Sequence, residues 1–372
     1  MSFLKNICYI ISGIDKAVAF EWICEHLDKT KYTLHFVLLH SRKSDFEAYL
    51  EEASVPHVRF HYEGKRHLAA AVARTYSYLK KHRIVLVHAH LLDAGLVGSM
   101  AATLARVPLR IYTRHYSSYH HVYHRKGVMY DKLINRLSTR IVAVSEVVRT
   151  ILVDWENVSP GKVMTIPHGF LLKAFAEKND ERVISLKKKY QLEHAHPIIG
   201  VVSRYTSWKG IQFILPAFGN ILERYPDAVL VLANAKGEFQ IPIQRLLSAF
   251  PERNYREIAF ENDLYSLFQS FDIFIHCPID WHSEAFGQVY IEALATGIPS
   301  IFTVSGIGNE IAKDGENCLV VGYQDTNAIH ERLMQLLQDP SLREKLAVQG
   351  PYSLSSQFEL DRMILDLENL YD

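Results

Sequence analysis

The stretch DIFIHCPIDWHSEAFGQVYIEALATGIPSIFT, residues 272–303, contains the pattern on which the fold of this chain depends. A short apolar run at 272–276 leads into a loop, and the loop becomes helical at about Phe286–Gly287. The helix ends at Gly297, and Pro299 opens a second apolar run. A strand, a helix and a second strand in this order predict a βαβ unit and therefore a parallel sheet.

The same alternation of strands and helices fills the rest of the chain in two series. The expected strands of the first series are 6–11, 33–39, 57–60, 84–88, 109–113, 140–144 and 163–166. Those of the second series are 197–203, 228–233, 256–260, 272–276, 299–303 and 317–321. Their Val, Ile and Leu residues form unbroken runs, as in parallel sheets that helices cover on both faces.

The length of 372 residues suits two such domains, each with a doubly wound α/β fold. A charged, apolar-poor stretch at 170–196 separates the two series. Helices are expected at 17–28 and 66–82, and a buried helix at 94–105. Helical segments at 326–348 and 356–371 close the chain. Ligands of such sheets bind outside the carboxyl ends of the strands.

The composition excludes several classes of protein. Apolar residues make up 48% of the chain and charged residues 22%, which excludes disordered and collagen-like chains. The four cysteines form no CxxC pair, so neither a zinc ribbon nor a thioredoxin-type site is expected. Few cysteines without a pattern in a long chain indicate a reducing compartment. No run is long enough to span a membrane, and we read the N-terminal residues as a first buried strand rather than a signal peptide.

Charge is distributed unevenly although the net charge is zero. Residues 1–170 carry 23 Lys and Arg against 14 Asp and Glu, a balance of +9, and residues 171–372 carry 18 against 27, a balance of −9. The two halves therefore suit different partners, although drift in composition is an equal alternative. Basic residues of the first half include Arg106, Arg110, Arg114, Arg125, Lys126, Lys132, Arg136 and Arg140.

The decisive stretch also predicts a site for a diphosphate between two sugars. The N–H groups of Gly287, Gln288 and Val289 lie at the start of the helix, where backbone amides lack partners and bind anions. Glu284 precedes the helix, and Glu292 follows eight residues later, about two helical turns further along. Each carboxylate can accept hydrogen bonds from sugar hydroxyls, with the phosphates at the helix start between them.

The pattern E-x-F-G-x4-E-A-x-A-x-G-x-P, from Glu284 to Pro299, resembles the signature of family 4 glycosyltransferases, which are retaining enzymes of the GT-B fold. This resemblance implies two Rossmann-like doubly wound domains that face a central cleft. The first would be an acceptor-side domain, 1–170, to which a C-terminal helix in 356–372 crosses back. The second, 171–355, would bind a nucleotide sugar. The alternative interpretation is an ordinary amphipathic helix with two solvent-exposed glutamates. Such a helix would not require these residue types in this fixed order.

Other segments carry the resemblance further. Val201–Gly210 is similar to the family segment G-R-x4-K-G, with Ser203 in place of Gly, and implies that Arg204 and Lys209 bind the donor diphosphate. In the first half, Ser12–Asp15 is similar to the Gly-rich N-terminal loop, which implies that Gly13 lies near the donor phosphates and the acceptor.

Four further segments of the first half match the family in order. They are Val87–His90, Ile111–His115, Ser145–Glu146 and Ile166–Phe170, the last with His168 in place of Asn. The second of them implies that His115 lies near the transferred sugar. His88 and His90 can be cleft-lining or structural.

The resemblance implies a glycosyltransferase that uses a UDP- or GDP-linked sugar and retains the anomeric configuration. Glu292 would hold the ribose, Glu284 hydroxyls of the transferred sugar, and the amides after Phe286 the diphosphate, with Lys209 and Arg204 stabilising its departure. The acceptor would be a glycan or a lipid-linked saccharide of the cell surface, and nucleic acid is not an expected partner. The aromatic and basic residues of 116–137 suit an anionic or lipid-linked acceptor or an anionic membrane, and a solvated face is the alternative. The expected location is the cytoplasm, with contact to the inner face of the membrane.

No metal or other cofactor is expected, because the chain has no Asp-x-Asp pair. His120, His121 and His124 offer at most two ligands on one helix face, and we interpret them as solvated or acceptor-facing. A rival class, a nicotinamide dehydrogenase, would need G-x-G-x-x-G after the first strand, and the nearest match, Gly306–Ile311, lacks the third Gly. A sugar-nucleotide epimerase of the same architecture is a second rival, and a degenerate transferase that only binds is a third.

Overall fold

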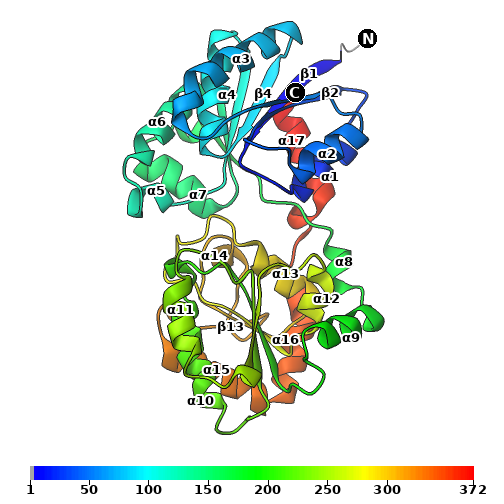
Figure 1. Cartoon of the computed structure of the whole chain (residues 1–372), viewed down its shortest axis with the longest axis vertical. Coiled ribbons are helices and arrows are strands. Elements are labelled where there is room, and N and C mark those ends of the chain that lie inside the picture. Colours follow the sequence, from blue (N-terminus) through cyan, green and yellow to red (C-terminus); the bar gives the residue numbers. More distant parts are fainter. Residues whose placement is uncertain (1–3) are drawn as a thin grey trace. The chain divides into compact units, whose positions relative to one another are not determined.

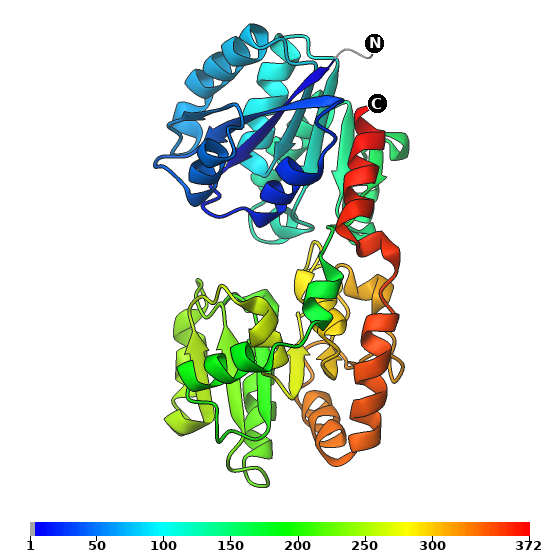
Figure 2. The same cartoon turned by 90° about the vertical axis from the view of Figure 1, so that its right-hand side faces the viewer.

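The computed structural model describes residues 4–372, which form two compact units (Figures 1 and 2). Unit 1 comprises the residues up to Gly169 together with Leu360–Asp372, and unit 2 comprises Phe170–Glu359. Each unit is a parallel sheet between layers of helices, as the unbroken apolar runs predict.

Unit 1 contains a seven-stranded parallel sheet in the order β3-β2-β1-β4-β5-β6-β7. Its strands are β1 (Lys5–Ser12), β2 (Tyr32–Leu39), β3 (His57–Phe60), β4 (Leu86–His90), β5 (Leu109–Arg114), β6 (Arg140–Ala143) and β7 (Val163–Thr165). All seven correspond to expected strands. The largest shift is in β4, which begins and ends two residues later than predicted, so that His90 lies within the strand together with His88.

The helices of unit 1 cover both faces of this sheet. They are α1 (Val18–His26), α2 (Asp45–Glu52), α3 (Leu68–Lys81), α4 (Leu92–Leu104), α5 (Tyr119–Val122), α6 (Gly127–Leu137), α7 (Glu146–Thr150) and α17 (Leu360–Tyr371). Helix α4 is the predicted buried apolar helix, and α3 and α6 pack on either side of it (Figure 1). Gly95 allows α4 to pack closely on β5, because a Cβ there would lie 2.8 Å from the ring of Tyr112.

Helix α17 completes the core of unit 1 from the far end of the sequence (Figure 2). Its buried residues, Leu360, Met363, Ile364, Leu367, Leu370 and Tyr371, join the apolar cluster formed by β1, β2, α1 and α2. The Tyr371 hydroxyl is hydrogen-bonded to the hydroxyl of Tyr9, and it lies 2.7 Å from Nδ1 of His88. The helix is therefore part of the domain core rather than a surface attachment.

Unit 2 contains a six-stranded parallel sheet in the order β10-β9-β8-β11-β12-β13. Its strands are β8 (Ile198–Val202), β9 (Val229–Ala233), β10 (Tyr255–Ile258), β11 (Ile273–His276), β12 (Ser300–Phe302) and β13 (Leu319–Val320). Its helices are α8 (Leu172–Ala176), α9 (Asp180–Lys189), α10 (Ile211–Ile221), α11 (Gln240–Leu247), α12 (Leu264–Gln269), α13 (Gln288–Thr296), α14 (Gly308–Ile311), α15 (Thr326–Gln338) and α16 (Pro340–Tyr352).

The helical stretch predicted at 326–348 is confirmed in unit 2, but it is divided in two. The segment 326–348 is not a single helix, because α15 ends at Gln338 and α16 begins at Pro340. Proline lacks the N–H that a continuing helix needs but fits the first turn of a new one. Asp339 caps that new helix by accepting a hydrogen bond from Leu342 N at 2.9 Å.

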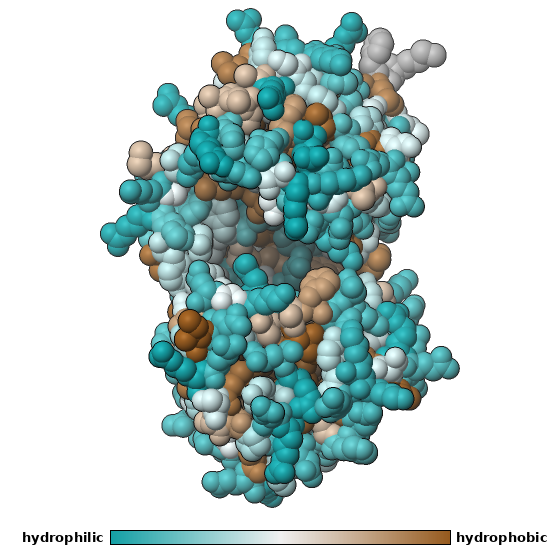
Figure 3. All heavy atoms as spheres, viewed as in Figure 1, coloured by the Kyte–Doolittle hydropathy of each residue, from teal (hydrophilic) through white to brown (hydrophobic). Residues whose placement is uncertain are grey.

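On the face shown in Figure 3, the surface of both units is mainly hydrophilic, with apolar residues scattered over it. Within the described part of the chain, no helix combines the length and apolarity that a membrane crossing needs.

Candidate functional site

Two of the predicted donor-site residues, Lys209 and Glu284, meet at the carboxyl edge of the sheet of unit 2. The loop after β8 carries Arg204 and Lys209, and the loop after β11 carries Glu284. Gly210 brings these loops together, since its φ is 74° and a Cβ there would lie 1.8 Å from the carbonyl oxygen of Cys277. Only glycine tolerates both the left-handed backbone and this close approach.

Lys209 and Glu284 form a direct ion pair. Glu284 is almost completely buried, and its Oε1 accepts a hydrogen bond from Lys209 Nζ and lies 3.0 Å from Nε2 of His276. Its main-chain N–H donates to Ser305 Oγ at 2.9 Å. The residue that the sequence assigns to the transferred sugar is thus held by two contacts of its carboxylate and one of its backbone.

The electrostatics of this cluster favour an ionised carboxylate. Burial opposes ionisation of Glu284, but Lys209 and His276 lower its pKa well below the ordinary value. Burial lowers the pKa of His276, against the opposing effect of Glu284. The cluster therefore contains a cation, an anion and a neutral imidazole.

His276 is a site residue that the sequence analysis missed. It ends the buried strand β11, at the position from which the loop to Glu284 departs. The available signal was a histidine as the last residue of an apolar run, eight residues before Glu284, because residues that end strands of a parallel sheet lie beside the ligand site.

Helix α13 begins as predicted, with Gly287 at its N-cap in the left-handed conformation and Gly297 at its C-cap. The amides of Gly287, Gln288 and Val289 have no acceptor within the helix. Phe286 is buried, and its ring stacks on Phe170 with centroids 6.1 Å apart. This packing fixes the helix start, where backbone N–H groups can bind an anion.

Glu292 lies on α13 but does not contact Glu284 within hydrogen-bond distance. It is 8% exposed, and burial raises its pKa to about 7. Among the described residues, no hydrogen bond to its carboxylate is recorded. Tyr265 is close enough for the charge of Glu292 to raise its pKa, after the larger effect of burial. The carboxyl is therefore held in a poorly solvated position, where hydroxyl donors from a ligand would favour its ionised form.

Arg204 has an exposed side chain on the same loop as Lys209, and no described residue pairs with its guanidinium. Lys209, by contrast, already forms an ion pair with Glu284. The structure thus provides one engaged cation and one available cation on a single loop.

His115 belongs to a row of histidines in unit 1. Its Nε2 lies 2.9 Å from Nδ1 of His90, and its ring stacks on His168 with centroids 5.5 Å apart. His88 lies 2.6 Å from Thr113 Oγ1 within the same sheet. Burial, with smaller effects from neighbouring histidines, lowers the pKa of His115 to about 3, so the row is neutral at physiological pH.

Gly13 has a φ of 64° and lines a cavity of about 360 Å³ at the carboxyl ends of β1 to β4. Its other lining residues are Ser12, Leu39, His40, Ser41, Tyr62, Gly64, Leu91, Leu92 and Asp93. Hydroxyl, imidazole and carboxylate groups therefore share this cavity, which suits a ligand that carries hydroxyl groups.

Two expectations about the basic half of the chain are wrong for some of their residues, although His124 and most of the basic residues are exposed as expected. Arg114 is completely buried rather than part of a basic surface, and it donates to Asp131 at 3.1 Å and to Glu156 at 2.7 Å. His120 is also buried, with Nδ1 2.7 Å from Asp131, and Nε2 of His121 lies 3.1 Å from Glu156. Carboxylates distant in the sequence draw these basic groups inward, because a buried charge needs a partner.

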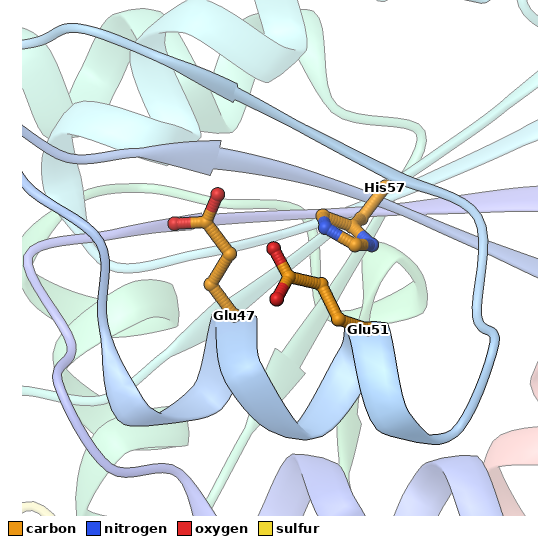
Figure 4. Close-up of side chains that lie close together, drawn as sticks. All are labelled: Glu47, Glu51 and His57. Carbon is orange, nitrogen blue, oxygen red and sulfur yellow. The ribbon is translucent and has the colours of Figure 1, made fainter.

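A group of possible metal ligands lies elsewhere in unit 1 (Figure 4). Glu47 and Glu51 on α2 and His57 on β3 offer ligand atoms within 4.8 Å of one another. Glu47 also accepts from Arg59 Nε at 2.8 Å, and Glu51 is paired with Lys43. Both carboxylates are therefore already neutralised by cations.

Two family models match the chain in sequence. "Glycosyltransferase Family 4" matches residues 21–172, and "Glycosyl transferases group 1" matches residues 183–351. Together they cover the two successive α/β series, and the second contains Arg204, Lys209, Glu284 and Glu292.

Individual proteins show the same likeness. The capsular polysaccharide biosynthesis glycosyltransferase CapM of Staphylococcus aureus is 28% identical over 78% of this chain and 77% of its own length. A UDP-Gal:alpha-D-GlcNAc-diphosphoundecaprenol alpha-1,3-galactosyltransferase of Escherichia coli is 26% identical over 66% of this chain and 62% of its own length. The crystal structure of Anabaena HepE in complex with UDP and glucose superposes with a TM-score of 0.85 at 17% identity, over 99% of each chain. With two Rossmann-like parallel-sheet units and both family models matched in order, this chain is a family 4 glycosyltransferase of the GT-B fold.

Proposed function

We propose that this protein transfers a hexose from a UDP- or GDP-linked donor to a hydroxyl group of a glycan or lipid-linked acceptor, with retention of the anomeric configuration and without a metal ion. The observation that carries the proposal is the meeting of Lys209, Glu284 and the start of α13 at one edge of the sheet of unit 2. A cation and helix amides for a diphosphate thus lie beside a carboxylate for sugar hydroxyls.

Each group has a role in the transfer. Glu292 accepts hydrogen bonds from the ribose, and Glu284 accepts them from hydroxyls of the transferred sugar. When the bond from the anomeric carbon to the diphosphate oxygen breaks, its electron pair leaves with the diphosphate. Lys209, Arg204 and the amides of residues 287–289 stabilise the negative charge that develops there. The same cations supply the positive field that a metal ion supplies in other transferases.

The acceptor is assigned to unit 1. The cavity that contains Gly13 and Asp93 offers polar groups for a saccharide, and the resemblance assigns His115 to the transferred sugar. The segment of α5 and α6 supports a lipid-linked acceptor or an anionic membrane, because exposed cations, such as Lys126 and Lys132, lie among exposed apolar residues, such as Met129. Sedimentation with vesicles tests this part, and equal binding to neutral and anionic vesicles would contradict it.

The names of two relatives support the proposed class of acceptor and product. One is a capsular polysaccharide glycosyltransferase and the other acts on a diphosphoundecaprenol-linked sugar. We therefore place the activity in the synthesis of a cell-surface polysaccharide or glycolipid, at the cytoplasmic face of the membrane. An epimerase would need no acceptor, so product analysis separates that alternative from a transferase.

The experiment has two stages. A thermal-shift screen with UDP, GDP, ADP and their sugars identifies the donor, and mass spectrometry of the products with lipid-linked and free saccharide acceptors then detects transfer. Lys209→Ala should lower kcat about 100-fold or more, because the cation acts on charge that grows in the transition state.

The control is Lys188→Ala on the exposed face of α9, which should leave kcat unchanged. Unchanged turnover in Lys209→Ala, or conversion of the nucleotide sugar without an acceptor, would contradict the proposed function.

A further inference from the structure

Glu284 is held through only one of its two carboxylate oxygens. Lys209 and His276 both meet Oε1, and among the described residues no hydrogen bond to Oε2 is recorded. The main-chain bond to Ser305 fixes the backbone of the same residue. The arrangement therefore restrains the carboxylate and keeps one oxygen available for a ligand.

Among the described residues, only one of the two ring nitrogens of His276 has a hydrogen-bond partner. His276 is 1% exposed, and its ring packs edge-on against Tyr290 with centroids 4.9 Å apart. Its Nδ1 has no hydrogen-bond partner within the described part of the chain. A neutral imidazole carries one proton, and placing it on Nε2 gives the carboxylate a donor. The opposite tautomer would bury an unpaired N–H and face a carboxylate with a lone pair.

Lys209 has to serve two anions if it acts on the donor diphosphate. Its ammonium is paired with Glu284 in this structure, and its side chain is 16% exposed. If Lys209 turned toward a diphosphate, Glu284 would lose much of its cationic stabilisation inside a buried site. Such a carboxylate is driven toward protonation unless another donor remains on it.

We propose that His276 is a positioning residue for Glu284: its Nε2–H keeps the carboxylate ionised and oriented through Oε1, so that Lys209 is released to the departing diphosphate and Oε2 stays available to the transferred sugar. This inference rests on the proposed function, because it concerns the same site. It adds a residue that lies outside the signature from Glu284 to Pro299.

The first test compares two substitutions of His276. His276→Leu fills a similar volume without a donor, and it should lower kcat about 10- to 100-fold while the Kd of UDP or GDP changes less than about threefold. His276→Gln retains an N–H donor and should recover most of the lost turnover. The control is His330→Leu on α15, a second histidine with an unpartnered Nδ1, which should leave kcat unchanged.

A double-mutant cycle shows whether His276 acts through Glu284. In a Glu284→Ala background, His276→Leu should cause no further loss of residual turnover. An equal loss in both backgrounds would overturn the proposal. Full activity of the His276→Leu variant, in an assay in which the wild-type enzyme is active, would overturn it as well.

A measurement without turnover separates this inference from the proposed function. Two-bond proton–nitrogen NMR of histidine-labelled protein should show His276 protonated at Nε2 and bare at Nδ1, and Lys209→Ala should preserve that pattern. A proton on Nδ1, or loss of the Nε2 proton in Lys209→Ala, would overturn the inference. Failure of the wild-type protein to transfer sugar from any donor would instead overturn the proposed function.

Discussion

Glu292→Gln should stabilise unit 2 above neutral pH while it weakens nucleotide binding. Burial raises the pKa of Glu292 from 4.5 to about 7, so the folded protein holds this proton more tightly than the unfolded chain does. The stabilising contribution of the protonated carboxyl is therefore fully present below pH 4.5 and is lost as the pH rises through 7.

The size of the effect follows from the two pKa values. Their difference is about 2.5, and at about 1.36 kcal/mol per pKa unit the ionised, buried carboxylate costs up to about 3 kcal/mol of folding free energy. Glutamine has nearly the same shape and no charge to desolvate. The stability gap between Glu292→Gln and wild type should thus be near zero at pH 4, grow up to pH 7 and stay constant above it.

Urea unfolding followed by circular dichroism from pH 4.5 to 8.5 measures this gap. Glu344→Gln on the exposed face of α16 is the matched control and should show no gap at any pH. A Glu292→Gln protein that is no more stable than wild type at pH 8, or a gap that is independent of pH, would refute the reasoning.

The same substitution should weaken UDP or GDP binding at least tenfold. The reason is that an ionised acceptor makes stronger hydrogen bonds to ribose hydroxyls than an amide does. Because these hydroxyls favour the ionised form of Glu292, binding to wild type near pH 6 should release protons. Calorimetry in two buffers of different ionisation enthalpy detects this release, and its absence would contradict the assigned role of Glu292.

Two further substitutions test the packing around the sites. Gly210→Ala should destabilise unit 2 by about 2 kcal/mol or more in urea unfolding, because the new Cβ meets the carbonyl oxygen of Cys277 at 1.8 Å. The control, Gly315→Ala, has a similar φ of 69° and no atom within 4 Å of the new Cβ, so it should destabilise unit 2 less. Equal losses of stability in the two variants would contradict the steric argument. Arg114→Met should destabilise unit 1 by about 3–5 kcal/mol, since it leaves two buried carboxylates without their cation; exposed Arg125→Met is the control, and similar losses in the two variants would contradict the account.

The sheet order and the helix start of α13 depend on local signals, and the sequence predicts them well. Unbroken apolar runs locate the strands because both faces of the sheets are covered. Gly287 and Gly297 delimit α13 because both adopt the left-handed conformation that helix ends use. For Lys209 and Glu284, the sequence predicts that each follows a strand of the same sheet. It does not predict that the two side chains form an ion pair.

Other features depend on partners that are far away in the sequence. Arg114 is one of many basic residues in its half of the chain, and nothing local to it shows that Asp131 and Glu156 meet it in the core. His120 looks like an exposed member of a polar helix for the same reason. Pro340 and His276 are local signals that were missed: Pro340 marks a helix boundary inside a segment with continuous helical periodicity, and His276 ends a buried strand.

The placement of α17 in the core of unit 1 has a consequence for synthesis on the ribosome. All of unit 2 is translated before residues 360–371, so unit 1 lacks one of its core helices until the whole sequence of unit 2 has been made. Until then the apolar surface that Leu367 and Tyr371 later cover stays open to water and to chaperones. The core of unit 1, whose sheet is made first, is therefore completed only after the sequence of unit 2 has been translated.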